Sequence, residues 1–199
     1  MAAWAAFARK HAPDTPASYF HRTFGLRNDA IIGGLIDGLN PDRLRELAAE
    51  KERLFRESAR GHLVLLPGVR ELLESLAANG VPAAVVTSTP RENLAMILET
   101  LHIERYFGAL VAEEDTTKGK PDPEGFLLAA SRLGVPPERC VVIEDAPAGL
   151  DAARAAGMKA IGVTTTRPAP DLAAADLVVE SLAEESVATF IYSLLRAGG

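Results

Sequence analysis

The second part of the chain alternates short apolar runs with longer segments of helical periodicity, and this alternation constrains the fold more than any other feature. The apolar runs of strand length lie at 81–86, 107–112, 140–143, 159–163 and, more weakly, 177–180. Because they are continuously apolar rather than alternating with polar residues, both faces of each strand should be buried. The sequence therefore predicts an α/β fold, with a Rossmann-like parallel sheet sandwiched by helices.

The first part of the chain reads as helices only. Asn40-Pro41 is a good N-cap and first-turn pair, and leucines follow it at helical spacing. We therefore expect a small helical domain over residues 1–61 and an α/β core over residues 62–199. In the core, Thr89-Pro90-Arg91-Glu92 predicts a helix start with Thr89 as its hydroxyl cap.

Composition excludes several classes of function. The net charge is −6 and the pI is about 5.3, so there is no basic surface for nucleic acid or an anionic membrane. No apolar run reaches membrane-span length. The single Cys140 forms no intrachain disulfide and fits a reducing compartment. The first ten residues carry their charges after the apolar stretch, unlike a secretory signal. We expect a cytoplasmic protein.

Polar side chains follow three of the predicted strands. Ligands of parallel sheets bind at the carboxyl ends of the strands, so these residues are candidate site residues. Thr87 and Ser88 could bind an anion or cap the next helix. Lys120, in a loop of prolines, could neutralise a phosphate or simply be solvated. Glu144 and Asp145 could hold Mg²⁺, or be satisfied by helix N–H groups.

Taken together and in this order, these segments resemble the haloacid dehalogenase superfamily of phosphohydrolases and phosphomutases. Three segments carry the resemblance in the core, namely Val85-Val86-Thr87-Ser88-Thr89-Pro90, Gly119-Lys120-Pro121-Asp122-Pro123 and Val142-Ile143-Glu144-Asp145-Ala146-Pro147-Ala148-Gly149. In addition, Phe24-Gly25-Leu26-Arg27-Asn28-Asp29 resembles the helical cap of the beta-phosphoglucomutase-like and phosphoglycolate-phosphatase-like branch.

The resemblance implies acyl-phosphate chemistry on a small phosphorylated metabolite. An aspartate attacks phosphorus, and a second aspartate two residues on acts as acid and base. Thr87, Ser88 and Lys120 would bind the phosphoryl group, and Glu144 and Asp145 would hold the Mg²⁺ cofactor. In the cap, His21, Arg27 and Asn28 could face the substrate. Arg27 is offset by one from the place of the arginine in the mutase branch, so the resemblance does not favour a mutase over a phosphatase.

One element of the family pattern is absent from the sequence. The catalytic aspartates lie in Asp-x-Asp-Gly after a hydrophobic strand before the cap, and no such segment occurs in the 199 residues. The nearest match, Leu35-Ile36-Asp37-Gly38, lacks the second aspartate and is expected to be a turn between cap helices. The absent strand is the central one of the sheet, between the strands that end at Thr87 and Asp145.

Removing a central strand leaves a slot about twice the strand spacing of about 4.8 Å. Three arrangements would repair it. The flanking strands could pair directly, a partner chain could donate a strand, or the natural protein could begin upstream of Met1, which we favour. The chain is accordingly expected to be a monomer, or a dimer if a strand is supplied in trans.

The leading hypothesis is a Mg²⁺-dependent phosphatase or phosphomutase, present here in an N-terminally truncated and inactive form. An alternative is a non-catalytic regulatory protein that keeps a weak phosphate and metal pocket. Dehalogenase activity is a third alternative, but those relatives need no metal, and Glu144 with Asp145 argues against it.

Overall fold

A computed structural model of the protein describes residues 2–196. The chain divides into two compact units, Met1–Val64 and Leu65–Gly199. No helix in the described range is long and apolar enough to cross a membrane.

The first unit consists of helices, as its sequence predicts. They are α1 (Ala2–His11), α2 (Ala17–Thr23), α3 (Asn28–Gly33) and α4 (Pro41–Ala59). Their buried faces form an apolar core of Trp4, Phe7, Ala8, Phe20, Ile31, Ile32 and Leu47. The predicted cap of α4 is confirmed, because the Asn40 side chain accepts a hydrogen bond from the Arg43 N–H at 2.8 Å. Residues 35–38 form turns between α3 and α4, as expected.

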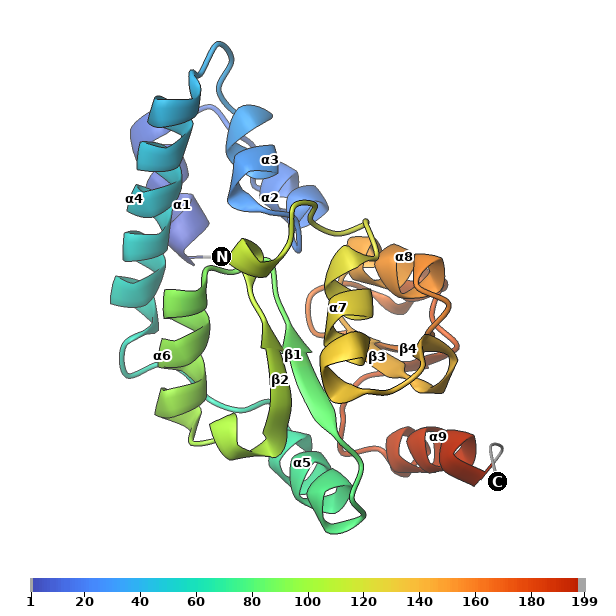
Figure 1. Ribbon diagram of the computed structural model, residues 1–199. Helices are drawn as coiled ribbons and strands as arrows, with labels where there is room; N and C mark the ends of the chain where they lie inside the picture. The colour runs from blue at the N-terminus through green and yellow to red at the C-terminus, as the bar shows by residue number, and fades with distance from the viewer. Residues whose placement is uncertain (1, 197–199) are drawn as a thin grey trace. The chain divides into compact units, whose positions relative to one another are not determined.

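The second unit alternates strands and helices in the predicted order (Figure 1). Its helices are α5 (Val69–Ala78), α6 (Arg91–Leu101), α7 (Glu124–Leu133), α8 (Pro147–Ala155) and α9 (Glu185–Arg196). Its strands are β1 (Ala83–Val86), β2 (Phe107–Val111), β3 (Val141–Glu144), β4 (Lys159–Val163) and β5 (Leu177–Val179). Short 3₁₀ helices, which periodicity did not predict, are η1 (Glu104–Tyr106), η2 (Glu113–Asp115), η3 (Pro137–Arg139) and η4 (Ala169–Leu172).

The strands form two separate parallel sheets. One has the order β1-β2 and the other the order β3-β4-β5. Among the described residues, β1 and β3 do not pair with each other, so direct pairing of the two flanking strands is not how this fold is completed. Ile143, in the middle of β3, is 37% exposed, which is unusual for an apolar residue of a strand in such a sheet. In the part of the chain that the structure describes, β1 and β3 therefore each have one edge whose hydrogen-bonding groups have no strand partner.

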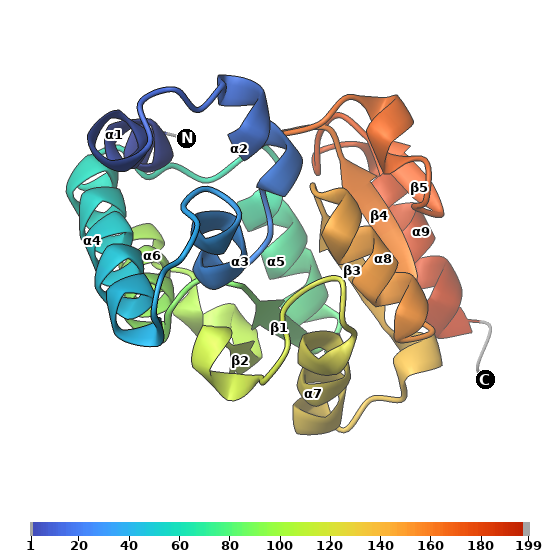
Figure 2. The same ribbon diagram turned by 90° about the horizontal axis from the view of Figure 1, so that it is seen from above.

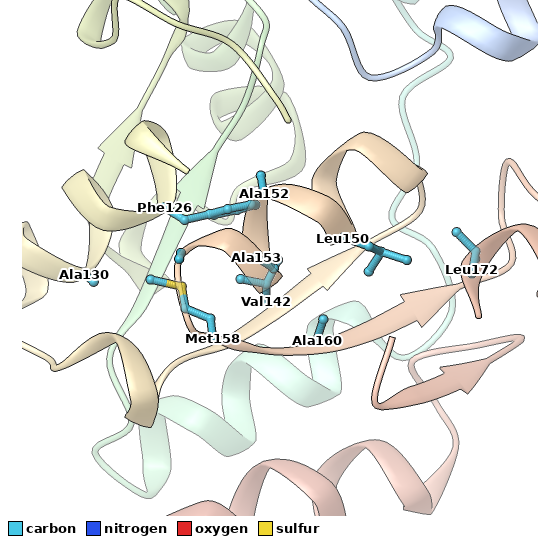
Figure 3. Packing of buried hydrophobic residues seen from close by; sticks show 10 residues of the cluster. Phe126, Ala130, Val142, Leu150, Ala152, Ala153, Met158, Ala160 and Leu172 are labelled. Carbon is cyan, nitrogen blue, oxygen red and sulfur yellow. The ribbon is translucent and has the colours of Figure 1, made fainter. Parts of the chain in front are cut away.

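Helices cover these strands and create the main core of the unit. Helix α7 packs on β1 and β2, and α8 packs on β3 and β4 (Figures 1 and 2). Phe126 of α7, Val142 of β3 and Leu150 of α8 belong to one buried cluster (Figure 3). Val86, at the end of β1, packs against the same cluster. This shared core holds the carboxyl ends of β1 and β3 near each other although the strands are not paired.

The predicted cap of α6 is wrong. The helix begins at Arg91, and its N-cap residue is Pro90 rather than Thr89; Pro90 makes no side-chain capping bond. Instead, the Arg91 N–H donates to both carboxylate oxygens of Glu114, at 3.1 and 3.0 Å. A residue of another loop therefore caps the helix, which local sequence rules do not anticipate.

The side chain of Asp115 links the end of β2 to helices α6 and α7. Its carboxylate forms ion pairs with Arg91 and with Arg132, the latter at 2.8 Å, and accepts a hydrogen bond from the Ala112 N–H at 2.8 Å. The hydrogen bond from Arg132, then that from Ala112 and the charges of both arginines, outweigh burial and lower the pKa of Asp115. Helices α6 and α7 are thus tied to the end of β2.

Candidate active site

Lys120 lies where the loops after β1, β2 and β3 meet. Its Nζ atom donates to the carbonyl oxygen of Val86 at 3.4 Å and pairs with Oε1 of Glu144. It also lies 5.1 Å from the centre of the Phe126 ring. The side chain is only 13% exposed, so it is not the solvated surface lysine that its loop position alone could suggest. The ammonium group therefore joins the carboxyl ends of both sheets.

The loop that carries Lys120 is anchored at the start of α7. The Glu124 carboxylate accepts hydrogen bonds from the N–H groups of Thr117 and Lys118 and from the Thr117 hydroxyl, at 2.8 to 3.1 Å. Asp122 in turn accepts a hydrogen bond from the Glu124 N–H at 3.0 Å. These bonds fix the backbone on both sides of Lys120.

Glu144 ends β3 and is held between Lys120 and α8. Its side chain is 10% exposed. On the helix side, its carboxylate lies directly against Gly149: a β-carbon built on that glycine would lie no more than 2.6 Å from any of the three carboxylate atoms. A larger residue at this position would therefore displace the Glu144 carboxylate, and Gly149 leaves the room that this carboxylate occupies.

Asp145 follows Glu144 and has different partners. The Thr165 hydroxyl donates to Oδ2 of Asp145 at 3.3 Å, and the Thr166 hydroxyl donates to the backbone carbonyl of Asp145 at 2.7 Å. Both threonines follow β4. The two adjacent carboxylates therefore have different partners. Glu144 is held by Lys120, and Asp145 is held by the turn after β4.

Thr87 and Ser88 are half-buried in the loop between β1 and α6. The Thr87 N–H continues the β1–β2 ladder by donating to the Val111 carbonyl at 2.9 Å, and the Thr87 hydroxyl accepts a hydrogen bond from the Thr89 N–H at 3.1 Å. The N-cap position of α6 is occupied by Pro90 and not by Thr87 or Ser88. Both follow directly after Val86, the residue that Lys120 contacts.

Two carboxylates fit the demands of Mg²⁺ on a protein. Mg²⁺ prefers oxygen ligands, and it often takes one or two carboxylates and completes its shell with water and substrate phosphate. Within the described part of the chain, no group of three or more His, Cys, Asp or Glu side chains could hold a metal ion. The chain therefore offers Glu144 and Asp145 as donors and leaves the other positions to water, phosphate or a further segment.

The cap residues named from the sequence all lie in the first unit. His21 is exposed in the last turn of α2. Arg27 is half-buried and precedes α3. Asn28 is buried, and its side-chain amide donates a hydrogen bond to Glu52 at 2.6 Å. This amide is therefore engaged inside the first unit.

Sequence reasoning missed Thr165, Thr166 and the close approach at Gly149. The two threonines had a detectable signal, because they stand directly after the fourth predicted strand. The rule that ligands bind at the carboxyl ends of parallel strands applies to that strand as well. The contact of Gly149 with Glu144 has no such signal, because it depends on how α8 packs against β3.

Comparison with known proteins yields a family and many relatives. Residues 1–157 match the family model described as haloacid dehalogenase-like hydrolase. The chain is 33% identical over 186 residues to a chloroplastic 5-amino-6-(5-phospho-D-ribitylamino)uracil phosphatase of Arabidopsis thaliana, covering 92% of this chain and 50% of the relative. It is 35% identical over 182 residues to validoxylamine A 7'-phosphate phosphatase of Streptomyces hygroscopicus subsp. limoneus, covering 92% of this chain and 85% of the relative.

Solved structures have the same fold. A beta-phosphoglucomutase from Clostridium difficile aligns with a TM-score of 0.86 at 24% identity, over 98% of this chain and 90% of the other. A HAD hydrolase of family IA, variant 3, from Entamoeba histolytica aligns with a TM-score of 0.85 at 25% identity, over 97% and 90%. The parallel strands and helices predicted from sequence are thus those of this fold.

Proposed function

This chain belongs to the haloacid dehalogenase-like hydrolases, and on that premise we propose that its core binds the phosphoryl group of a small phosphorylated metabolite together with Mg²⁺. The two relatives described above carry names of phosphatases that act on phosphorylated small molecules. The chain spans about half the length of the first of them and 85% of the second.

The position of Lys120 is the observation that carries the proposal. A nearly buried ammonium group at the meeting point of three strand ends is costly unless it is paired, and here it is paired with Glu144. Phosphoryl transfer depends mainly on positive charge placed in advance around the phosphoryl oxygens. Lys120 supplies that charge, and its anchored loop holds it in position.

The remaining residues have complementary roles. The hydroxyl groups of Thr87 and Ser88 donate hydrogen bonds to the phosphoryl oxygens. Glu144 and Asp145 hold the cation. When bound, Mg²⁺ supplies further charge stabilisation of the phosphoryl oxygens.

The nucleophile is the part that these 199 residues do not contain, since no two aspartates are separated by a single residue. We propose that a strand with an Asp-x-Asp end lies between β1 and β3 in the active protein. In the described residues, the edges of β1 and β3 that have no strand partner and the exposed Ile143 support this proposal. Residues 1–199 alone are then inactive, and the strand comes from an upstream segment or from a second chain in a dimer.

Binding of orthophosphate tests the role of Lys120 separately from turnover. We expect the Lys120→Met variant to bind orthophosphate in the presence of Mg²⁺ about 10- to 100-fold more weakly than the parent, because a charge-assisted hydrogen bond contributes roughly 1.5–3 kcal/mol. Isothermal titration calorimetry measures the dissociation constant, and circular dichroism checks the fold. Lys118→Met is the matched control, because Lys118 lies in the same loop and its side chain is 72% exposed. Equal affinity in all three proteins contradicts the proposal.

Turnover of p-nitrophenyl phosphate tests the missing strand. Residues 1–199 should show no Mg²⁺-dependent release of p-nitrophenol. A fusion that places an apolar strand ending in Asp-x-Asp-Gly before Met1 should release it, and the same fusion with Asn-x-Asn should not. Clear Mg²⁺-dependent turnover by residues 1–199 alone would refute the proposed inactivity.

A second candidate is a non-catalytic phosphate- and metal-binding protein that acts in regulation. The absence of an Asp-x-Asp pair favours it. Tight and specific binding of a phosphorylated metabolite, combined with no turnover even in the Asp-x-Asp fusion, would support this candidate over the enzyme. The single Cys140 is compatible with either protein in the cytoplasm.

A further inference from the structure

The turn after β4 is rigidly placed next to the loop of Asp145. The Thr164 N–H donates to the Val179 carbonyl at 3.0 Å, which extends the pairing of β4 with β5. The Thr165 N–H donates to the Val163 carbonyl at 2.8 Å, which closes a tight turn. Because its backbone is fixed at two successive residues, this turn can serve as a support for the neighbouring loop.

Two hydroxyl groups connect this support to Asp145, and they act on different atoms. The Thr166 hydroxyl donates to the backbone carbonyl at 2.7 Å and so fixes the peptide. The Thr165 hydroxyl donates to Oδ2 of the carboxylate at 3.3 Å and so fixes the rotation of the side chain. Together they define both the position and the orientation of one carboxylate.

The two acidic residues of the site differ in whether their negative charge is already paired with a positive group. Glu144 is ion-paired with Lys120. For Asp145, the described structure records one side-chain hydrogen bond, from a neutral hydroxyl, and no ion pair. A hydroxyl occupies one lone pair of a carboxylate and leaves its charge available to a cation. Asp145 is thus the carboxylate better prepared to bind a divalent cation.

We propose that Thr165 and Thr166 are positioning residues that hold Asp145 for the binding of a divalent cation. This inference rests on the proposed function, because it concerns the same cation. It adds that the affinity is set partly by the turn after β4, outside the segment that carries the two acids. Partners that orient a metal ligand typically change metal affinity by about 10- to 100-fold when they are removed.

Binding of Mn²⁺ as a probe for the divalent cation tests the inference without any need for turnover. Electron paramagnetic resonance of free Mn²⁺ gives the dissociation constant for the parent and for Thr165→Val and Thr166→Val. We expect Thr166→Val to weaken binding about tenfold. Thr165→Val should have a smaller effect, about threefold, because its hydrogen bond is longer and its side chain is exposed. Thr164→Val is the matched control and should bind like the parent, because in the described structure the hydroxyl groups that contact Asp145 belong to Thr165 and Thr166.

Two further measurements separate positioning from a general loss of structure. Thr165→Ser and Thr166→Ser keep the hydroxyl and should restore most of the Mn²⁺ affinity. Orthophosphate affinity measured without a metal depends on Lys120 and should stay unchanged in the valine variants. If a valine variant does not fold, the serine variant of the same residue takes its place in the test and should keep most of the Mn²⁺ affinity of the parent.

The outcomes distinguish this inference from the proposed function. If the parent binds Mn²⁺ and the valine variants bind it equally well, the inference is overturned and the proposed function stands. Failure of the serine variants to restore affinity also overturns it. If the parent itself binds no Mn²⁺, both the inference and the metal-binding part of the proposed function are wrong.

Discussion

Replacing Gly149 with alanine tests the packing at the centre of the site. The added β-carbon would lie no more than 2.6 Å from any atom of the Glu144 carboxylate, well inside the closest approach that real β-carbons make. Gly149 lies within α8 and has no positive φ angle, so the backbone itself tolerates alanine. The cost of the substitution therefore comes from the displacement of Glu144 alone.

The magnitude follows from two opposing effects. Moving the carboxylate separates it from Lys120, and both side chains are almost buried, at 10% and 13% exposure. Losing a hydrogen bond between charged groups costs about 1.5–3 kcal/mol. Alanine in place of glycine within a helix returns about 0.5–1 kcal/mol. The net expectation for Gly149→Ala is a decrease of about 1–2 kcal/mol in the free energy of unfolding.

A double-mutant cycle measures this effect directly by urea unfolding. In the Glu144→Ala background there is no carboxylate to displace, so Gly149→Ala should become stabilising by about 0.5–1 kcal/mol. Gly33→Ala in α3 is the matched control, because a β-carbon there meets nothing within 4 Å and should also stabilise. If Gly149→Ala destabilises the Glu144→Ala protein as much as the parent, the proposed contact is not the cause and the reasoning is refuted.

Three further predictions concern groups away from the proposed binding site. The pKa of Asp115 is lowered, chiefly by its hydrogen bond from Arg132. Its contribution to stability is therefore fully present above its unfolded pKa of about 3.9 and is lost as the pH falls through its lower native-state pKa. Asp115→Asn should therefore destabilise the protein at pH 7 and much less at pH 3 in urea unfolding, and an equal loss at both pH values argues against this. Burial, and then the charge of Glu138, raise the pKa of the Cys140 thiol. At pH 8 the thiol should therefore react with a disulfide reagent more slowly in the native protein than in urea. Equal rates would contradict the burial of this thiol. Asn40→Ala should lower the free energy of unfolding by about 1 kcal/mol, whereas Asn40→Asp should not, because aspartate keeps an acceptor for the Arg43 N–H. An equal loss of stability in both variants would show that this capping bond is unimportant.

Much of the fold is predictable from local sequence because the relevant signals are short in range. Continuous apolar runs and helical periodicity predict the order of the strands and helices. Gly134 illustrates the strength of such signals: it ends α7 in the left-handed conformation, as its place after the apolar positions indicates. The cap at Thr89 failed for the opposite reason, since Glu114 from another loop takes its place.

The sequence alone determined which kinds of group stand at the strand ends, namely hydroxyls at Thr87 and Ser88, an amine at Lys120 and adjacent carboxylates at Glu144 and Asp145. Only the tertiary structure decided which of them meet. Lys120 and Glu144 are 24 residues apart, and Thr165 lies 20 residues from Asp145. Contacts over such separations depend on how helices pack on the two sheets, and no local pattern of residues specifies that packing.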